Sequence, residues 1–224
     1  MEAASELSAA GWVRERIVTF AQDVGSLVPA CFEMYARVLH PAGPGEVHWG
    51  DIARKLGRTI HPEVQFQNVA TPLGMVIPHQ QHEVEGPWEC PSPGTLPESL
   101  RNHLGSVLST FTTTSDRVWF ALWEGYEGLQ PRPRPGRPLL DLPNRQYLVY
   151  VGPLSDLPSW HWEGPNLWWP DDRAWFVASE IDLVATYVGG SAAAIAELLN
   201  DPLLEVVPSS VTDRITADAD RVNV

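Results

Sequence analysis

The stretch AWFVASEIDLVATYVGGSAAAIAELL, residues 174–199, decides the fold. Its first two parts, 174–181 and 183–188, are short runs rich in aromatic and β-branched residues, which are typical of strands. The third part, 191–199, follows two glycines and is rich in alanine and leucine, which favour a helix with Ser191 as its N-cap. Strands that adjoin without strict strand–helix alternation favour an α+β fold with a mainly antiparallel sheet and helices packed on it.

Three further strands are predicted upstream of this stretch. The run CFEMYARVL alternates apolar and polar residues, which predicts a strand over 32–39 with one buried face. Aromatic and β-branched runs predict strands over 117–124 and 146–152. The sequence QPRPRPGRP between these two runs favours an extended loop, so we expect the two strands to form a hairpin with a long connection.

Two helix patterns complete the expected fold. Apolar residues recur on one face over 96–109, and Thr95 with Glu98 forms a T-x-x-E pattern that predicts a capping box. A short helix is predicted to follow Asp51 as its cap and to end at a left-handed Gly57. We therefore expect one α+β domain over 1–208, followed by a loose acidic C-terminal tail over 209–224.

Charge and composition exclude several classes of protein. The 224 residues include 15 Lys and Arg against 28 Asp and Glu, for a formal net charge of −13, which argues against nucleic acid as a partner. No run approaches about 18 apolar residues, which argues against an ordinary membrane span. The first residues lack a basic leader with an apolar run, and the two cysteines are far apart in the sequence, so a cytoplasmic location is expected.

Nucleophiles and metal ligands are only weakly indicated. Ser191 is expected to cap a helix, with an anion site at the same helix start as the alternative. His79 and His82 form the tightest histidine cluster, but no H-E-x-x-H or second ligand motif accompanies them, so no metal and no cofactor are expected. Cys31 is expected to be buried in a strand, and Cys90 is expected to have a pKa raised by its acidic neighbour Glu89, so neither resembles an activated nucleophile.

Carboxylates at strand ends are the candidate catalytic groups. Glu124 ends one predicted strand, and Glu180 and Asp182 end another. If these two strands pair, Glu124 and Glu180 converge beside aromatic rings, as the acid and base of a glycoside hydrolase do. The alternative is that all three acids are solvated at the rim of the sheet.

Tryptophans provide the candidate binding site. The sequence SWHWEGPNLWWPDDR holds four indoles with interleaved acids, which predicts a ligand-binding segment over 160–173 for a sugar or a cation. A lid packed over the sheet is equally open, and we expect at least two of the four indoles to be packed, which leaves one or two to bind a ligand. The candidate binding residues are Trp160, Trp162, Trp168, Trp169, Asp171 and Asp172.

Two segments carry a resemblance to a known family. The runs VGSLVPACFEMYARVLHPA and GPNLWWPDDRAWFVASEIDLVATYVGGSAAAIAELLNDPLLEVVP resemble an uncharacterised actinobacterial protein family, from about Val24 to Pro208. This resemblance implies a bacterial, cytoplasmic protein. It implies no reaction, ligand or catalytic residue.

The sequence leaves more than one function open. We expect first a noncatalytic binding or interaction protein with an acidic, tryptophan-rich surface. Its partner would be an unidentified protein or a small cationic or hydroxyl-rich ligand. The alternative is a carboxylate-dependent hydrolase that acts on a sugar or a similar neutral substrate. A purely structural role comes third.

Overall fold

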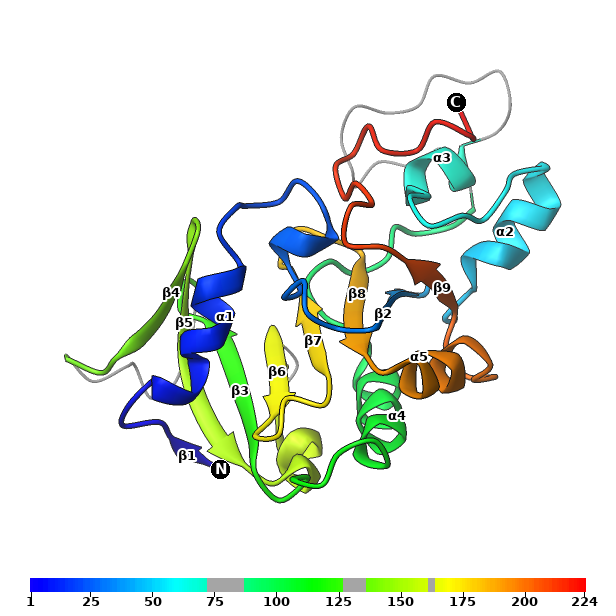
Figure 1. Ribbon diagram of the computed structural model, residues 1–224. Coiled ribbons are helices and arrows are strands. Elements are labelled where there is room, and N and C mark those ends of the chain that lie inside the picture. Colours follow the sequence, from blue (N-terminus) through cyan, green and yellow to red (C-terminus); the bar gives the residue numbers. More distant parts are fainter. Residues whose placement is uncertain (72–86, 127–135, 161–163) are drawn as a thin grey trace.

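The computed structural model describes residues 1–71, 87–126, 136–160 and 164–224. Within these residues, nine strands form one sheet in the order β1-β5-β3-β6-β7-β8-β2-β9, with β4 paired to the outer side of β5 (Figure 1). Every strand pair is antiparallel. The strands are β1 (Glu2–Ala3), β2 (Met34–Leu39), β3 (Val118–Trp123), β4 (Leu139–Leu142), β5 (Arg145–Gly152), β6 (Leu167–Pro170), β7 (Phe176–Ser179), β8 (Ala185–Gly190) and β9 (Val206–Ser209).

Helices cover both faces of this sheet. The α-helices are α1 (Gly11–Arg16), α2 (Trp49–Leu56), α3 (Phe66–Ala70), α4 (Glu98–Ser109) and α5 (Ala192–Leu199), and the short 3-10 turns are η1 (Ser8–Ala10), η2 (Val24–Ser26) and η3 (Leu154–Ser159). Residues of α4, α5 and η3 pack on one face of the sheet, and residues of α1, η2, α2 and α3 contribute to the core of the other. The sheet is therefore the middle of three layers.

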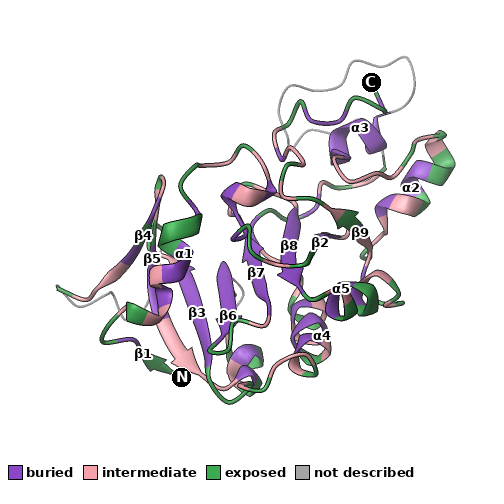
Figure 2. Cartoon of the chain, in the orientation of Figure 1, coloured by how far each residue is buried: buried purple, intermediate pink, exposed green. Residues whose placement is uncertain are grey.

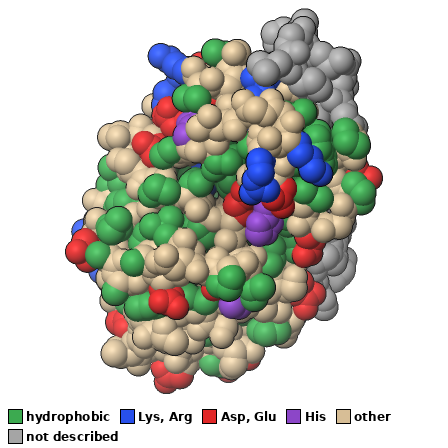
Figure 3. All heavy atoms as spheres, turned by 90° about the vertical axis from the view of Figure 1, so that its right-hand side faces the viewer, with side chains coloured by type: hydrophobic (Ala, Val, Ile, Leu, Met, Phe, Trp, Pro, Cys, Tyr) green, Lys and Arg blue, Asp and Glu red, His purple; other side chains and the backbone are tan. Residues whose placement is uncertain are grey.

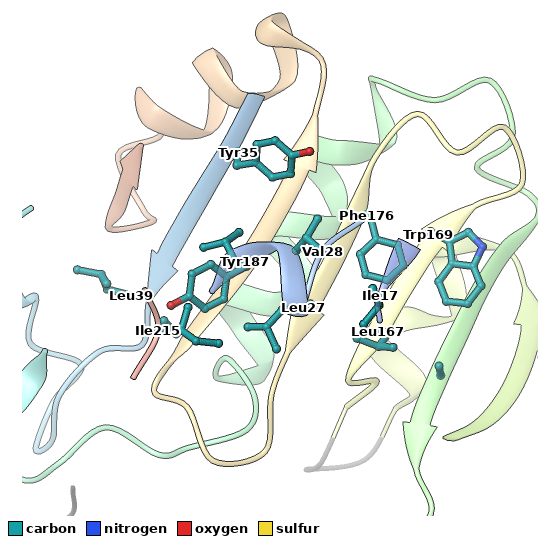
Figure 4. Packing of buried hydrophobic residues seen from close by; sticks show 14 of the residues in the cluster. Ile17, Leu27, Val28, Tyr35, Leu39, Leu167, Trp169, Phe176, Tyr187 and Ile215 are labelled. Atoms are coloured by element: carbon teal, nitrogen blue, oxygen red, sulfur yellow. The ribbon is translucent and has the colours of Figure 1, made fainter. Parts of the chain in front are cut away.

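The central strands are buried on both sides because both faces are covered. Strands β3, β6, β7 and β8 are buried along almost their whole length (Figure 2). On the face that carries α1 and η2, Trp169, Phe176 and Tyr187 point into one apolar cluster with Leu27 and Ile215 (Figure 4). Such strands read as continuous apolar runs rather than as alternating ones.

The predicted fold class is confirmed. The α+β arrangement with a mainly antiparallel sheet is present, and each of the five predicted strands and both main helices occurs with bounds shifted by a few residues. The predicted pairing of the strands near 117–124 and 146–152 is the β3–β5 pair. Six further elements were not predicted as such: α1, α3, β1, β4, β6 and β9.

The helix ends differ from two of the predictions. Helix α4 has Pro97 as its N-cap with no side-chain hydrogen bond, and the Thr95 hydroxyl donates to the Leu96 carbonyl instead, so the capping box does not form. Helix α2 begins at Trp49, which places Asp51 inside its first turn. Gly57 does end α2 in the left-handed conformation, and the Ser191 hydroxyl does cap α5 by accepting from the Ala194 N–H.

The C-terminal residues are packed rather than loose. Ile215, Ala219, Asp220 and Asn223 are buried, and the segment runs beside α3 (Figure 1). The Asp220 carboxylate accepts hydrogen bonds from the backbone N–H of Gln65, just before α3, and from the backbone N–H of Asn223. Acidic composition suggested a solvated tail, but this carboxylate is an internal hydrogen-bond acceptor.

Candidate functional site

Two of the three candidate catalytic carboxylates meet at one arginine. Glu180 and Asp182 lie in the turn between β7 and β8, and Arg145 is the first residue of β5. The Nη2 atom of Arg145 donates to Glu180 Oε1 at 2.5 Å and to Asp182 Oδ2 at 2.8 Å, and its Nε donates to Glu180 Oε1 at 3.1 Å. The three side chains therefore form one ion-pair network.

Aromatic rings enclose the arginine of this network. Its guanidinium carbon lies 4.7 Å from the ring centre of Phe20 and 5.6 Å from that of Trp123, which are cation–π distances. The Glu180 side chain is 5% exposed, whereas that of Asp182 is 72% exposed. Burial raises the pKa of Glu180, and the hydrogen bonds from Arg145 oppose that rise.

This arrangement has the chemistry of a cation site that is already filled. Carboxylates beside aromatic rings select a cation, and here the cation is the protein's own Arg145. Because both carboxylates bond to the same Nη2 atom, the guanidinium occupies the space between them. In a retaining glycosidase, whose carboxyl groups are about 5 Å apart, the scissile bond lies in that space.

The predicted convergence of Glu124 with Glu180 is wrong. Strand β6 lies between β3 and β7, so the strands that carry these two acids do not pair. Alternation along β3 puts Glu124 on the same face of the sheet as Phe120, which belongs to the core under α4. Glu180 is on the same face as Phe176, which belongs to the core on the opposite side of the sheet. Glu124 is exposed at the end of its strand, as the rim alternative has it.

The two adjacent tryptophans of the candidate binding segment are core residues. Trp168 and Trp169 lie in β6 and are each 1% exposed. They point to opposite faces: Trp168 packs edge-on to Trp175 at 5.2 Å, and Trp169 stacks on Phe176 at 5.4 Å. Their assignment to a ligand-binding surface is therefore wrong, because a strand covered on both faces buries successive side chains.

The acids after this strand are exposed but serve local structure. Asp171 Oδ1 accepts from the indole Nε1 of Trp119 at 2.9 Å. Asp172 accepts from the hydroxyl of Thr112 and from the backbone N–H of Thr113, just beyond α4. Partial burial opposes ionisation of Asp172, but these hydrogen bonds outweigh it and lower its pKa. Both acids tie the β6–β7 turn to neighbouring segments.

Trp160 is the one described indole of the segment that stays partly exposed. Its ring packs edge-on to Tyr150 at 5.5 Å and tilted against Phe120 at 5.8 Å, so one side of it belongs to the core under α4. Trp162 lies outside the described residues, as do His79 and His82. Most other described tryptophans are buried, so a tryptophan-rich surface is not found on the described part of the chain.

An open depression of about 490 Å³ lies between α4 and η3. Asn102, Ser106 and Ser109 of α4 line one wall, and Leu154 and Leu157 of η3 contribute apolar surface. Asn102 Oδ1 is buried and has no hydrogen-bond partner among the described residues. This depression was not predicted from the sequence, although the spacing of Asn102, Ser106 and Ser109 at i, i+4 and i+7 is a polar stripe that indicates one helix face.

Histidines and cysteines of the described residues are held in structural roles. His61 and His103 pair through Nε2 with Asp220 and Asp201, at 2.9 and 2.7 Å. His40 is fully buried between the Ser92 carbonyl and the Thr186 hydroxyl, and this burial lowers its pKa to about 4. Among the described residues, no group of three or more His, Cys, Asp or Glu is placed to hold a metal ion.

The cysteines differ from expectation in one respect. Cys31 is exposed and precedes β2, so its predicted burial within a strand is wrong. Its partial desolvation nevertheless raises its pKa, against the effect of Arg16. The pKa of Cys90 is raised to about 11, as predicted in direction, but the cause is burial rather than an acidic neighbour. Neither thiol has the lowered pKa of a nucleophile.

Surface charge is mixed on the side that carries α2. Acidic, basic and hydrophobic side chains are interspersed there (Figure 3).

Comparison with known proteins does not identify the chain: no family model matches it, and neither a curated protein nor a solved structure matches it. In the described segments, no helix has the length and apolar character needed to cross a bilayer. The resemblance to an actinobacterial family stays a prediction.

Proposed function

We propose that this chain is a noncatalytic binding protein, and that the depression between α4 and η3 takes a small, uncharged, hydroxyl-rich ligand. The observation that carries the proposal is an open hollow of about 490 Å³ between α4 and η3 whose lining includes several serine side chains and apolar residues. Ligand sites typically measure about 300–1,000 Å³ and combine apolar surface with a few polar groups.

The polar lining favours hydroxyl groups over charges. Ser106, Ser109, Ser115 and Ser155 line the depression, and serine hydroxyls both donate and accept. The carboxylate of Asp116 adds acceptors, which suit ligand O–H donors. Pro153 and Pro158, which are more exposed than Leu154 and Leu157, offer apolar surface on which the C–H face of a sugar or polyol would rest. Among the described residues, no basic side chain lines this hollow, so an anionic ligand is disfavoured.

The acid and base candidates support binding over catalysis. Glu180 and Asp182 are engaged by Arg145, and His61 and His103 by aspartates. A catalytic base has to be within reach of substrate and free to accept a proton. The free cysteines and the net charge of −13 support a cytoplasmic protein that does not bind nucleic acid.

The proposal is tested by amide NMR titration with a panel of monosaccharides, disaccharides and polyols. We expect shifts that saturate and that concentrate on α4 and η3. Replacing exposed Ser106 by Phe should fill the depression and abolish these shifts. Ala196→Phe, on the exposed side of α5, places the same ring outside the depression and should leave them unchanged. Shifts that survive Ser106→Phe would place the ligand elsewhere.

A carboxylate-dependent hydrolase is the alternative, and one observation favours it. Burial raises the pKa of Glu180, as it does for the general acid of a glycosidase, and Asp182 lies beside it. The alternative requires Arg145 to leave the space between the two carboxylates. It predicts turnover of aryl glycosides that is lost in Glu180→Gln. Undetectable turnover in the wild-type chain supports the binding proposal.

A further inference from the structure

Helix α4 begins without a side-chain cap. It has 12 residues, and its N-cap is Pro97, which makes no side-chain hydrogen bond. The first N–H groups of any helix lack intrahelical partners and carry a partial positive charge. The hydroxyl of Thr95, which would usually cap such a helix, makes a 3.3 Å hydrogen bond to the Leu96 carbonyl. In the described part of the chain, no capping side chain therefore accepts from the start of α4.

A buried arginine lies at this helix start. Arg101 is 3% exposed, and the one hydrogen bond described for its guanidinium runs from Nη2 to the Trp160 carbonyl at 3.2 Å. Its Nε and Nη1 are buried and have no hydrogen-bond partner in the described segments, and the same holds for the indole Nε1 of Trp160. Buried donors without acceptors are costly, and a buried cation without an anion more so.

The neighbours of Arg101 place its guanidinium at the N-terminal end of α4. Gly164 has a φ of +61°, and a Cβ at this position would lie 2.5 Å from Arg101 Nη1 and 3.0 Å from Thr95 Oγ1. The guanidinium therefore reaches back toward Thr95, as long side chains in helices do. Thr95 and Trp160, which lie beside this guanidinium, are both partly exposed.

The electrostatics of this position are unfavourable in the absence of an anion. A cation near a helix N-terminus is repelled by the helix dipole. Burial lowers the pKa of Arg101, and the carboxylate of Glu98 only partly opposes that effect. Natural proteins tend to tolerate such conflicts where a ligand resolves them. An oxyanion would supply acceptors to the guanidinium and a charge of the right sign to the helix.

We propose that Arg101, the Thr95 hydroxyl and the first-turn N–H groups of α4 form a binding site for a small oxyanion, a carboxylate or a phosphate group. The planar guanidinium would bind it through Nη1, its unpartnered donor on the Thr95 side, because Nε lies on the opposite edge beside Nη2. Helix N-termini bind the same groups elsewhere. The site is separate from the depression between α4 and η3, because Arg101 does not line that hollow.

The test is thermal unfolding of the whole chain with sodium phosphate, sodium acetate or sodium chloride at equal ionic strength. We expect the melting temperature to rise and saturate with phosphate or acetate but not with chloride. Whichever of phosphate and acetate raises the melting temperature more identifies the ligand group as a phosphate or a carboxylate. Arg101→Met should abolish the response, and Thr95→Val should weaken binding by about tenfold, which is the loss of one hydrogen bond to an ion. The matched control is Arg54→Met, which removes an exposed arginine of α2 and should change nothing.

Two results would overturn the proposal: no saturable response to either oxyanion in the wild-type chain, or a response that persists in Arg101→Met. If Arg101→Met does not fold, the Nε–H resonance of Arg101 in the wild-type chain decides the matter. It should shift on titration with the effective anion and with the same midpoint as the thermal response. An Nε–H resonance that stays in place rejects the site. Ser106→Phe should leave all these responses intact, which separates this site from the proposed ligand depression.

Discussion

Arg145 shows how one residue can remove a predicted active site while building a stable contact. The sequence predicts carboxylates beside aromatic rings, and the structure has them, yet Arg145 lies between Glu180 and Asp182. Nothing near Arg145 in the sequence indicates this partner, because the contact spans 35 residues. Short sequence motifs indicate only contacts between residues that are close in the sequence. The contact between Arg145 and Glu180 depends instead on how the sheet places β5 beside the β7–β8 turn.

Replacing Arg145 by Met should therefore destabilise the fold. The change leaves Glu180, 5% exposed, without its partner, and breaking a buried pair in this way costs about 3 kcal/mol. Chemical denaturation at neutral pH measures the loss. Adding Glu180→Gln to Arg145→Met should recover part of it, because the unpaired charge is removed. Arg54→Met, which breaks an exposed pair with Asp51, should cost at most about 1 kcal/mol. Equal losses in Arg145→Met and Arg54→Met would contradict this account.

His40 makes the stability depend on pH. Burial lowers its pKa from an ordinary 6.5 to about 4, so between these values the unfolded chain binds a proton that the folded chain does not. Stability should therefore fall as pH drops from 6.5 to about 4, by roughly 3 kcal/mol from this residue alone. Denaturant titrations across this range should show a shallower slope in His40→Gln, whose side chain does not titrate. The same slope in both proteins would rule out His40 as the source.

At the scale of elements, helix α2 is capped from a distant part of the chain. Glu205, just before β9, accepts from the backbone N–H groups of Trp49 and Gly50 at 2.6 Å each. The sequence predicts a cap at Asp51 instead, because capping rules consider only the residues next to a helix. A cap supplied by a residue about 155 positions away leaves no local pattern.

Removing this distant cap should weaken α2 and its packing. Glu205→Ala leaves two N–H groups of the first turn without acceptors, and the loss of a cap costs about 1–2 kcal/mol. Hydrogen exchange should show the amides of α2 losing protection first. Glu205→Gln keeps an acceptor oxygen and should lose less, and Glu197→Ala, exposed on α5, is a control that should lose almost nothing. Unchanged protection in Glu205→Ala would mean that tertiary packing alone holds the start of α2.

Strand β6 explains both the success and the failure of the sequence analysis. Strands with clear β-branched or aromatic runs, such as β7 and β8, were predicted within a few residues. The four residues LWWP lie between Gly and Pro signals and resemble a loop, yet β6 pairs with both β3 and β7. Its insertion buries Trp168 and Trp169 and separates Glu124 from Glu180. One missed strand therefore accounts for most of the errors in the candidate site.

At the scale of the whole molecule, the last residues of the chain complete the layer formed by α2 and α3. Asp220 has a fully buried side chain that accepts from His61 Nε2 at 2.9 Å, from the backbone N–H of Gln65 at 3.2 Å, and from the side-chain amide of Asn223 at 2.9 Å. Composition alone cannot separate a solvated acidic tail from this arrangement. The difference depends on donors that lie about 155 residues upstream.

Asp220→Asn should consequently destabilise the whole fold rather than only its C-terminal end. The amide keeps one oxygen but turns an NH₂ group toward N–H donors, and we expect a loss of about 3 kcal/mol from unsatisfied buried groups. Burial opposes the charged form of Asp220, but hydrogen bonds from Asn223 and His61 outweigh it and lower its pKa below the ordinary 3.8. The carboxylate therefore stabilises the fold above pH 3.8, and this contribution is lost as the pH falls below that value. Denaturation curves should show a difference in stability between wild type and Asp220→Asn that is large at pH 7 and smaller in acid. Glu197→Gln, which changes an exposed carboxylate of α5, should show little difference from wild type at any pH. A difference in stability that stays constant with pH would mean that the shape of the Asp220 side chain, and not its charge, stabilises the packing of the C-terminal residues.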